Sequence, residues 1–117
     1  MGEFFLTLLH AATNAHILHL QSKSFSEHSA LGEFYSELPD LVDSVIEAVQ
    51  GLKGEIIQYP VDYYPPLDNG LDELEALKEY VEQERYIVLP KESEIQNEVD
   101  AIAKLIDSTL YKLRFLK

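Results

Sequence analysis

Four stretches of this sequence repeat apolar residues at spacings of three and four, and this pattern constrains the fold more than any other feature. Such spacing places the apolar side chains on one face of an α-helix. A chain of 117 residues has room for one domain with one core. We therefore expect a single all-α domain over residues 1–117, a four-helix bundle with helices over Glu3–Gln21, about Ser24–Gln50, about Leu71–Ile87 and Glu94–Leu116.

A capping motif indicates the start of the second helix, and apolar spacing indicates the core face of the first. Ser24 or Ser26 is expected to cap the second helix, because Glu27 follows Ser24 by three positions, as in a capping box. A serine side chain there accepts a hydrogen bond from a free backbone N–H of the first turn. The first helix is expected to turn these residues toward the core: Phe5, Leu8, Leu9, Ala12, His16 and His19.

Pro39 and a tyrosine- and proline-rich segment interrupt the helical pattern. Pro39 removes one backbone donor inside the second helix, so we expect a kink or a break into two pieces. Gly51 and Gly54 are expected to end that helix. The next stretch, GEIIQYPVDYYPPLDNG, holds three prolines and three tyrosines and is typical of an ordered connection. Its length predicts a crossover between the second and third helices, as in ferritin-like bundles.

Composition and charge exclude several classes of partner. The net charge is −12 and the nine basic residues are scattered, so binding to a phosphate backbone is not expected. No apolar run approaches the roughly 18 residues of a membrane span, and the first residues lack the basic region of a signal peptide. Cysteine is absent, which rules out disulfides and thiolate metal sites. We therefore expect a cytoplasmic protein that does not contact a membrane.

Histidines and carboxylates on the first two helices are candidate metal ligands. His16 and His19 are three residues apart on the predicted core face, and His28 opens the second helix. Asp43 and Glu47 are four residues apart, so their carboxylates share one face of that helix. At about 100° per residue this face points away from the apolar stripe. A site that joins these carboxylates to the histidines would therefore lie between two subunits. Imidazole and carboxylate ligands together are typical of iron or manganese sites.

Residues 16–54, a third of the chain, resemble the motif region of the Dps-type mini-ferritins. The motif is carried by FSEHSALGEFYSELPDLVDSVIEAVQGLKG, which follows a histidine-bearing helix end. In that family a histidine pair of one subunit and a carboxylate pair of its two-fold mate form an iron-oxidising site. The resemblance implies iron as the metal, and it implies His28, Asp43 and Glu47 as ligands. The histidine of the first helix is either His16, which keeps the family's spacing, or His19, which has the family's local context. Manganese and zinc are alternatives to iron.

Three departures from the mini-ferritin pattern are visible. The further acidic ligand of that family falls at Gly32, with Glu33 as its nearest substitute. Pro39 is foreign to that helix, and the basic tail that the family uses for DNA protection is missing.

The whole chain also resembles small bacteriophage-encoded proteins with the same histidine-bearing turn and an ending like TLYKLRFL. For those proteins the resemblance implies a ferritin-like fold.

Two functions follow as hypotheses. In the first, His19 and His28, with or without His16, bind a divalent ion together with Asp43 and Glu47 of a two-fold partner, and iron(II) is oxidised there. In the second, the protein is a non-enzymatic phage accessory or binding protein, on a ferritin-like bundle that has lost the metal site, with a protein or small-molecule partner. Its binding surface would be built from the Tyr/Pro connection and the outer helix faces.

Structural roles are the alternative for each of these residues. A hydrogen bond to a tyrosine or glutamate would explain His19 in the core, and solvation would explain Asp43 and Glu47. A homodimer or larger homo-oligomer is expected under both hypotheses, because outward apolar residues need cover. Three such residues are Leu18, Ile46 and Phe115.

Overall fold

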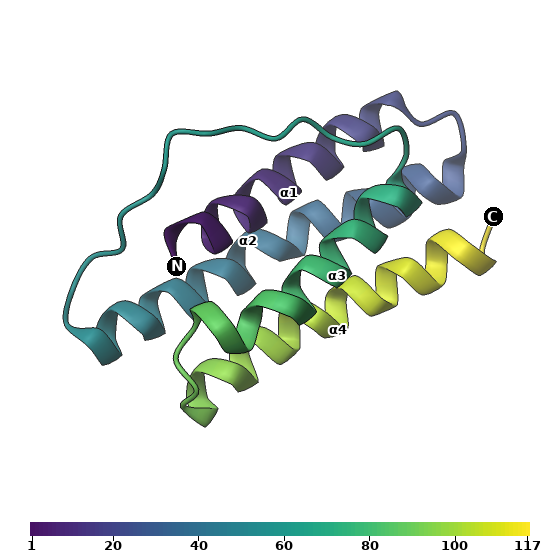
Figure 1. Cartoon of the computed structure of the whole chain (residues 1–117). Coiled ribbons are helices and arrows are strands. Elements are labelled where there is room, and N and C mark those ends of the chain that lie inside the picture. Colours follow the sequence, from purple (N-terminus) through teal and green to yellow (C-terminus); the bar gives the residue numbers. More distant parts are fainter.

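The computed structural model describes all 117 residues and contains four α-helices and no strand (Figure 1). The expected all-α class and the four helices are confirmed. Three of the helices begin and end within one residue of the expected positions, whereas the second runs three residues further. The helices are α1 (Gly2–Gln21), α2 (Phe25–Lys53), α3 (Gly70–Val88) and α4 (Ser93–Phe115).

The segment between α2 and α3, residues 54–69, is called the connection below. It has no regular secondary structure and runs along the length of the bundle, as Figure 1 shows. Gly70 at the start of α3 lies against Leu31 near the start of α2. The two helices therefore begin at the same end of the molecule and run parallel, which confirms the predicted crossover. Short turns join α1 to α2 and α3 to α4, so each of these pairs is antiparallel.

The ends of α2 show which local predictions were correct. The Ser24 side chain accepts a hydrogen bond from the backbone N–H of Glu27 at 3.3 Å, so Ser24 is the cap. Gly51 remains helical, and α2 ends at Gly54, whose φ of +68° favours glycine. Pro39 lies inside a continuous helix, so of the two expected outcomes the break into two pieces is wrong, and the kink stays a prediction. Leucines and valines on both sides of the proline are buried, and their packing outweighs one lost backbone hydrogen bond.

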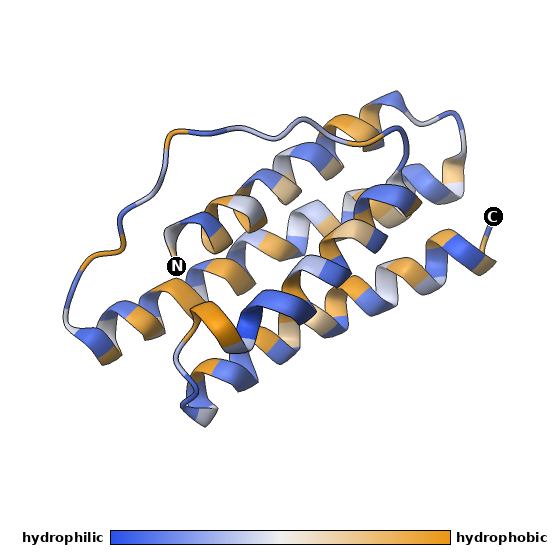
Figure 2. Ribbon diagram, viewed as in Figure 1, coloured by the Kyte–Doolittle hydropathy of each residue, from blue (hydrophilic) through white to orange (hydrophobic).

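One continuous core of 24 buried apolar residues fills the space between the helices. All four helices contribute to it, together with Ile57 of the connection and Leu89 of the last turn. In Figure 2 apolar and polar segments alternate along each helix, as the helical periodicity requires. None of the four helices combines the length and the apolar character that crossing a membrane requires.

The core face of α1 differs from the expected one. Its buried positions are Gly2, Phe4, Phe5, Leu8, Ala11, Asn14, Ala15 and Leu18. His16 is exposed and His19 only half-buried, so the expectation that both face the core is wrong. The cause is that apolar residues surround most of this helix, so its neighbours rather than its periodicity decide which face is buried.

The difference between the expected and the observed buried face of α1 also changes the argument for an oligomer. Leu18, expected to face outward, is 4 % exposed and belongs to the core, and Ile46 packs against the core. Phe115 is exposed as expected, at 73 %. Two of the three residues that seemed to need cover therefore have it within the chain, and the oligomeric state stays a prediction.

A buried polar network locks α3 to α4 near the turn between them. The Arg85 guanidinium donates to the side chain of Gln96 at 2.9 Å, to the backbone oxygen of Gln96 at 2.8 Å and to Asp100 at 2.6 Å. The Gln96 amide donates to the backbone oxygens of Arg85 at 3.1 Å and Pro90 at 3.0 Å. Both long side chains are buried, and every bond compensates for the water that burial removes.

Candidate functional site

His19 and His28 form a reciprocal clasp across the turn between α1 and α2. Nδ1 of His19 lies 2.5 Å from the carbonyl oxygen of His28, and Nδ1 of His28 lies 2.8 Å from the carbonyl oxygen of His19. A carbonyl oxygen only accepts hydrogen bonds, so each Nδ1 carries a hydrogen and donates it. With Nδ1 engaged in this way, Nε2 is the ring nitrogen that remains for another partner or a metal ion. The sequence predicted these two residues at the same end of the bundle, and this is confirmed.

His16, the third candidate ligand, lies close to the clasp but does not join it. Its exposed ring stacks on Tyr35 with the ring centroids 4.1 Å apart. The distance between the ring centroids of His16 and His19 is 6.2 Å. The three histidines therefore share one corner of the molecule.

The clasp does not fit a single-ion site within one chain. The His19 and His28 rings stack with centroids 3.6 Å apart and planes inclined by 17°. A histidine ligand holds its metal near the ring plane at about 2.0–2.1 Å from nitrogen. One ion cannot lie in both of these planes at that distance, so both rings would have to turn to share it. No group of three or more histidine, aspartate or glutamate side chains in the chain is close enough to hold a metal ion.

Gly32, the position at which the mini-ferritin pattern has an acidic ligand, lies directly beneath the clasp. A Cβ added to Gly32 would be 3.0 Å from Cε1 and 3.2 Å from Nδ1 of His19. The imidazole therefore occupies the space that a side chain at this position would need. The His19 ring can pack here because position 32 is a glycine and carries no side chain.

Asp43 and Glu47 are exposed on α2, as the helical phase predicted. They follow His28 by fifteen and nineteen residues on the same helix, which places them about 22 and about 28 Å further along its axis. Within one chain they do not meet the histidines. The predicted site takes its carboxylates from a two-fold partner, so it stays a prediction.

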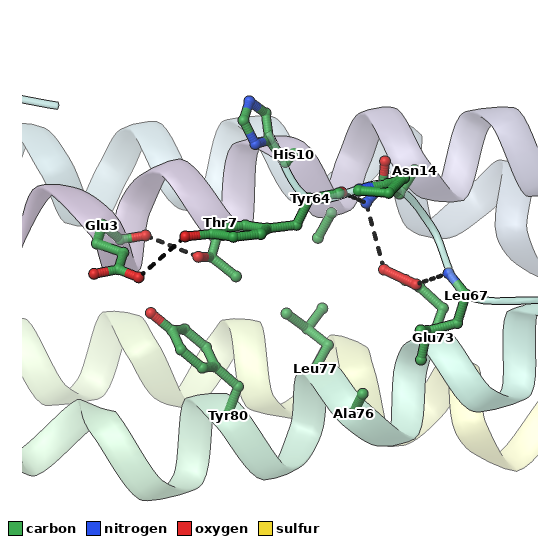
Figure 3. A pocket seen from close by; sticks show the side chains of 12 residues that line it. Glu3, Thr7, His10, Asn14, Tyr64, Leu67, Glu73, Ala76, Leu77 and Tyr80 are labelled. Atoms are coloured by element: carbon green, nitrogen blue, oxygen red, sulfur yellow. Dashed lines mark hydrogen bonds between the residues drawn. The ribbon is translucent and has the colours of Figure 1, made fainter. Parts of the chain in front are cut away.

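A cleft of about 460 Å³ lies between α1 and α3, bordered by the connection (Figure 3). We call it the α1–α3 cleft. Ala76 and Leu77 give it an apolar lining, and Tyr64 adds an aromatic ring from the connection. Figure 3 shows Glu3 and Glu73 at its opposite ends. Its volume is within the roughly 300–1,000 Å³ of small-molecule sites.

Asn14 holds the cleft and the connection together. Its side chain is 3 % exposed and donates to the backbone oxygen of Tyr64 at 2.9 Å and to Glu73 at 3.5 Å. The Tyr63 hydroxyl donates to the Asn14 side-chain oxygen at 2.9 Å. Glu73 in turn accepts the backbone N–H of Leu67 at 2.9 Å. One buried amide thus ties α1 to the connection and to α3.

Negative charge and burial raise the pKa values of two tyrosines that line the cleft. The negative charges of Glu3 and Asp62 raise the pKa of Tyr64 above its ordinary value of 10.0. Burial raises the pKa of Tyr80 above the same value. His10 also lines the cleft, and its Nδ1 atom is buried without a hydrogen-bond partner. The cleft therefore combines negative charge, aromatic rings and an unpaired polar atom.

Sequence reasoning placed His19 and His28 at the same end of the bundle but missed Asn14, Glu3 and Glu73. The available signal for Asn14 was a lone polar residue at helical spacing from Ala11 and Leu18, both now known to be buried. Nothing in the local sequence marks the two glutamates, because acidic residues abound on the outer faces of this chain. Tyr64 of the Tyr/Pro connection lines the cleft, and a binding role for the connection stays a prediction.

The fold and the cleft define an all-helical protein with one long crossover and a cleft alongside it. The model of a family of unknown function, DUF5856, matches residues 19–113, and the chain belongs to this family. A relative from Enterobacteria phage T4, described as an uncharacterized 14.6 kDa protein in the mobD-ri intergenic region, is 26 % identical over 115 residues. The match covers 95 % of this chain and 85 % of the relative. No solved structure matches the chain.

Proposed function

We propose that the protein is a non-enzymatic binding module whose ligand occupies the α1–α3 cleft. The observation that carries this proposal is a cleft of about 460 Å³ that has a mostly apolar lining and a border fixed by hydrogen bonds. Pockets with an apolar lining and a few placed polar groups are typical ligand sites. We propose that the protein is a phage accessory protein of the host cytoplasm, and the support is that a relative is encoded by phage T4.

A neutral probe tests whether the cleft binds small molecules. We would follow benzyl alcohol by saturation-transfer NMR with the wild type and with Ala76→Phe, whose ring would fill the cleft. Ala101→Phe, on α4 and outside the cleft, is the control for an added ring. Saturation transfer in the wild type and the control, with loss in Ala76→Phe, is expected. Equal transfer in all three proteins would overturn the proposal.

We propose further that the bundle is a ferritin-like fold that has lost the metal site. The support is the parallel α2–α3 pair with one long crossover, the connectivity of ferritin-like bundles. A metal role for the clasp is the second candidate function, favoured by the two Nε2 atoms that the Nδ1 hydrogen bonds leave free. In that case the stacked rings of His19 and His28 would turn apart to hold iron, manganese or zinc, together with Asp43 and Glu47 of a partner subunit.

Metal titration combined with solution mass separates these two candidates. On the metal hypothesis, iron(II) binds to a dimer or larger assembly, and Glu47→Ala abolishes binding. Iron binding that is unchanged in Glu47→Ala, or a wild-type protein that ignores iron, would rule out the inter-subunit site. The cleft proposal does not depend on this outcome, because Glu47 does not line the cleft.

A further inference from the structure

The two carboxylates of the α1–α3 cleft are separated along its length. Glu3 and Asn14 are eleven residues apart on α1, which corresponds to about 16 Å along the helix axis. The Glu73 carboxylate lies 3.5 Å from the Asn14 side-chain nitrogen, so it marks the far end of the same span. Figure 3 shows the two glutamates on either side of the tyrosine and leucine side chains. A ligand that meets both carboxylates must therefore be long and narrow.

Both carboxylates have capacity for a further donor. Each oxygen of Glu73 accepts one hydrogen bond, from Asn14 and from Leu67, while an ionised carboxylate offers about four lone-pair sites. Glu3 is exposed and accepts only a long bond of 3.4 Å from the Tyr64 hydroxyl. Ammonium groups, with three donors and a positive charge, match such positions. The net charge of −12 adds a field that draws cations toward the protein.

The space between the carboxylates suits hydrocarbon rather than further charge. Leu77 is buried at the floor, and Ala76 and the ring of Tyr64 continue the apolar lining. An aromatic face also attracts a cation that lies over it, and Tyr64 and Tyr80 both lie near the Glu3 end in Figure 3. Along the cleft, the Glu3 carboxylate with the two tyrosine rings comes first, the apolar wall follows, and the Glu73 carboxylate lies at the other end.

We infer that the cleft takes a linear organic diamine, bound as the di-ammonium ion with one ammonium at Glu3, the other at Glu73, and the carbon chain along Leu77. This inference rests on the proposed binding function and names the ligand class for that same cleft. It predicts selection for charge at both ends and for length between them.

Calorimetric titration with two diamines tests the inference. The long probe is α,ω-diaminododecane, and the short one is α,ω-diaminobutane, which carries the same charge but reaches one carboxylate at a time. The long diamine should bind at least about tenfold more tightly. We expect Glu73→Gln to weaken it about tenfold and Glu3→Gln about threefold, because Glu3 is more exposed to water. Glu79→Gln, the same charge change on α3 outside the cleft, should leave affinity within about twofold.

The outcomes separate this inference from the proposed function. Equal weakening by all three glutamine variants would mean that net charge attracts the diamine, and would overturn the inference. Tight binding of benzyl alcohol with no preference for the long diamine would also overturn it, while leaving the binding function intact. If neither probe binds, the proposed function itself fails. Glu3→Gln leaves every hydrogen bond of Glu73 in place, so one variant remains informative if Glu73→Gln unfolds.

Discussion

Replacing Asn14 by alanine should detach the connection from the bundle at a measurable cost. The change removes two hydrogen bonds of 2.9 Å, to Tyr64 and from Tyr63, each worth about 1 kcal/mol net. The third bond, to Glu73, is 3.5 Å long and adds little. Alanine returns up to about 0.7 kcal/mol as the better helix former. We therefore expect a loss of about 1.5 kcal/mol, or about 5 °C in Tm for a domain of this size.

The assay is urea unfolding followed by circular dichroism, with Asn97→Ala as the matched control. Asn97 is exposed on α4 and lies outside the cleft, so this variant should gain a few tenths of a kcal/mol from helix propensity alone. Chymotrypsin provides a second readout, because Asn14→Ala should speed cleavage after the tyrosines of the connection several-fold. Equal stability of the two variants, with unchanged cleavage, would refute the claim that Asn14 anchors the connection.

Three further predictions follow from the structure. Gln96→Ala removes three hydrogen bonds of a buried network, one of them from a guanidinium, and should lower the free energy of urea unfolding by about 3 kcal/mol. Gln83→Ala, on the exposed face of α3, should change the same free energy by no more than about 0.5 kcal/mol. Gly51→Ala, with open space around its Cβ, should stabilise α2 by about 0.5–1 kcal/mol, but Gly32→Ala should give no gain because its Cβ meets an imidazole; an equal gain at both sites would show that the clasp is not packed as described. The raised pKa of Tyr80 means that the unfolded chain loses the phenolic proton at lower pH than the folded protein does. Stability present below pH 10.0 should therefore fall as the pH rises through and above that value, and it should fall less steeply in Tyr80→Phe. Identical alkaline unfolding of the two proteins would contradict the burial of the Tyr80 hydroxyl.

The sequence predicted helix positions well because apolar periodicity and capping residues act over short stretches of chain. The start of α2 at Ser24 and the glycine at position 54 follow from backbone chemistry that acts within a few residues. The sequence could not decide whether Pro39 breaks α2, since the gain from burying its neighbours depends on other helices. The face of α1 was mispredicted, because a helix that is apolar nearly all round carries little information about which side is covered.

The candidate sites were predictable to different degrees for a similar reason. His19 and His28 are nine residues apart across a short turn, so their approach could be predicted, whereas the reciprocal hydrogen bonds depend on the space that Gly32 leaves. The cleft depends on pairs that are far apart in the chain. Asn14 meets Tyr64 across fifty residues and Glu73 across fifty-nine. No periodicity within a helix reports such a pair.

The most direct measurement is a map of backbone amide chemical shifts during titration with α,ω-diaminododecane. Binding in the α1–α3 cleft predicts saturable shifts at Thr7, Asn14, Ala76 and Leu77, with the residues around the clasp unchanged. Shifts that spread over the outer acidic face of α3, or that concentrate at His19 and His28, would contradict the assignment of the cleft as the binding site.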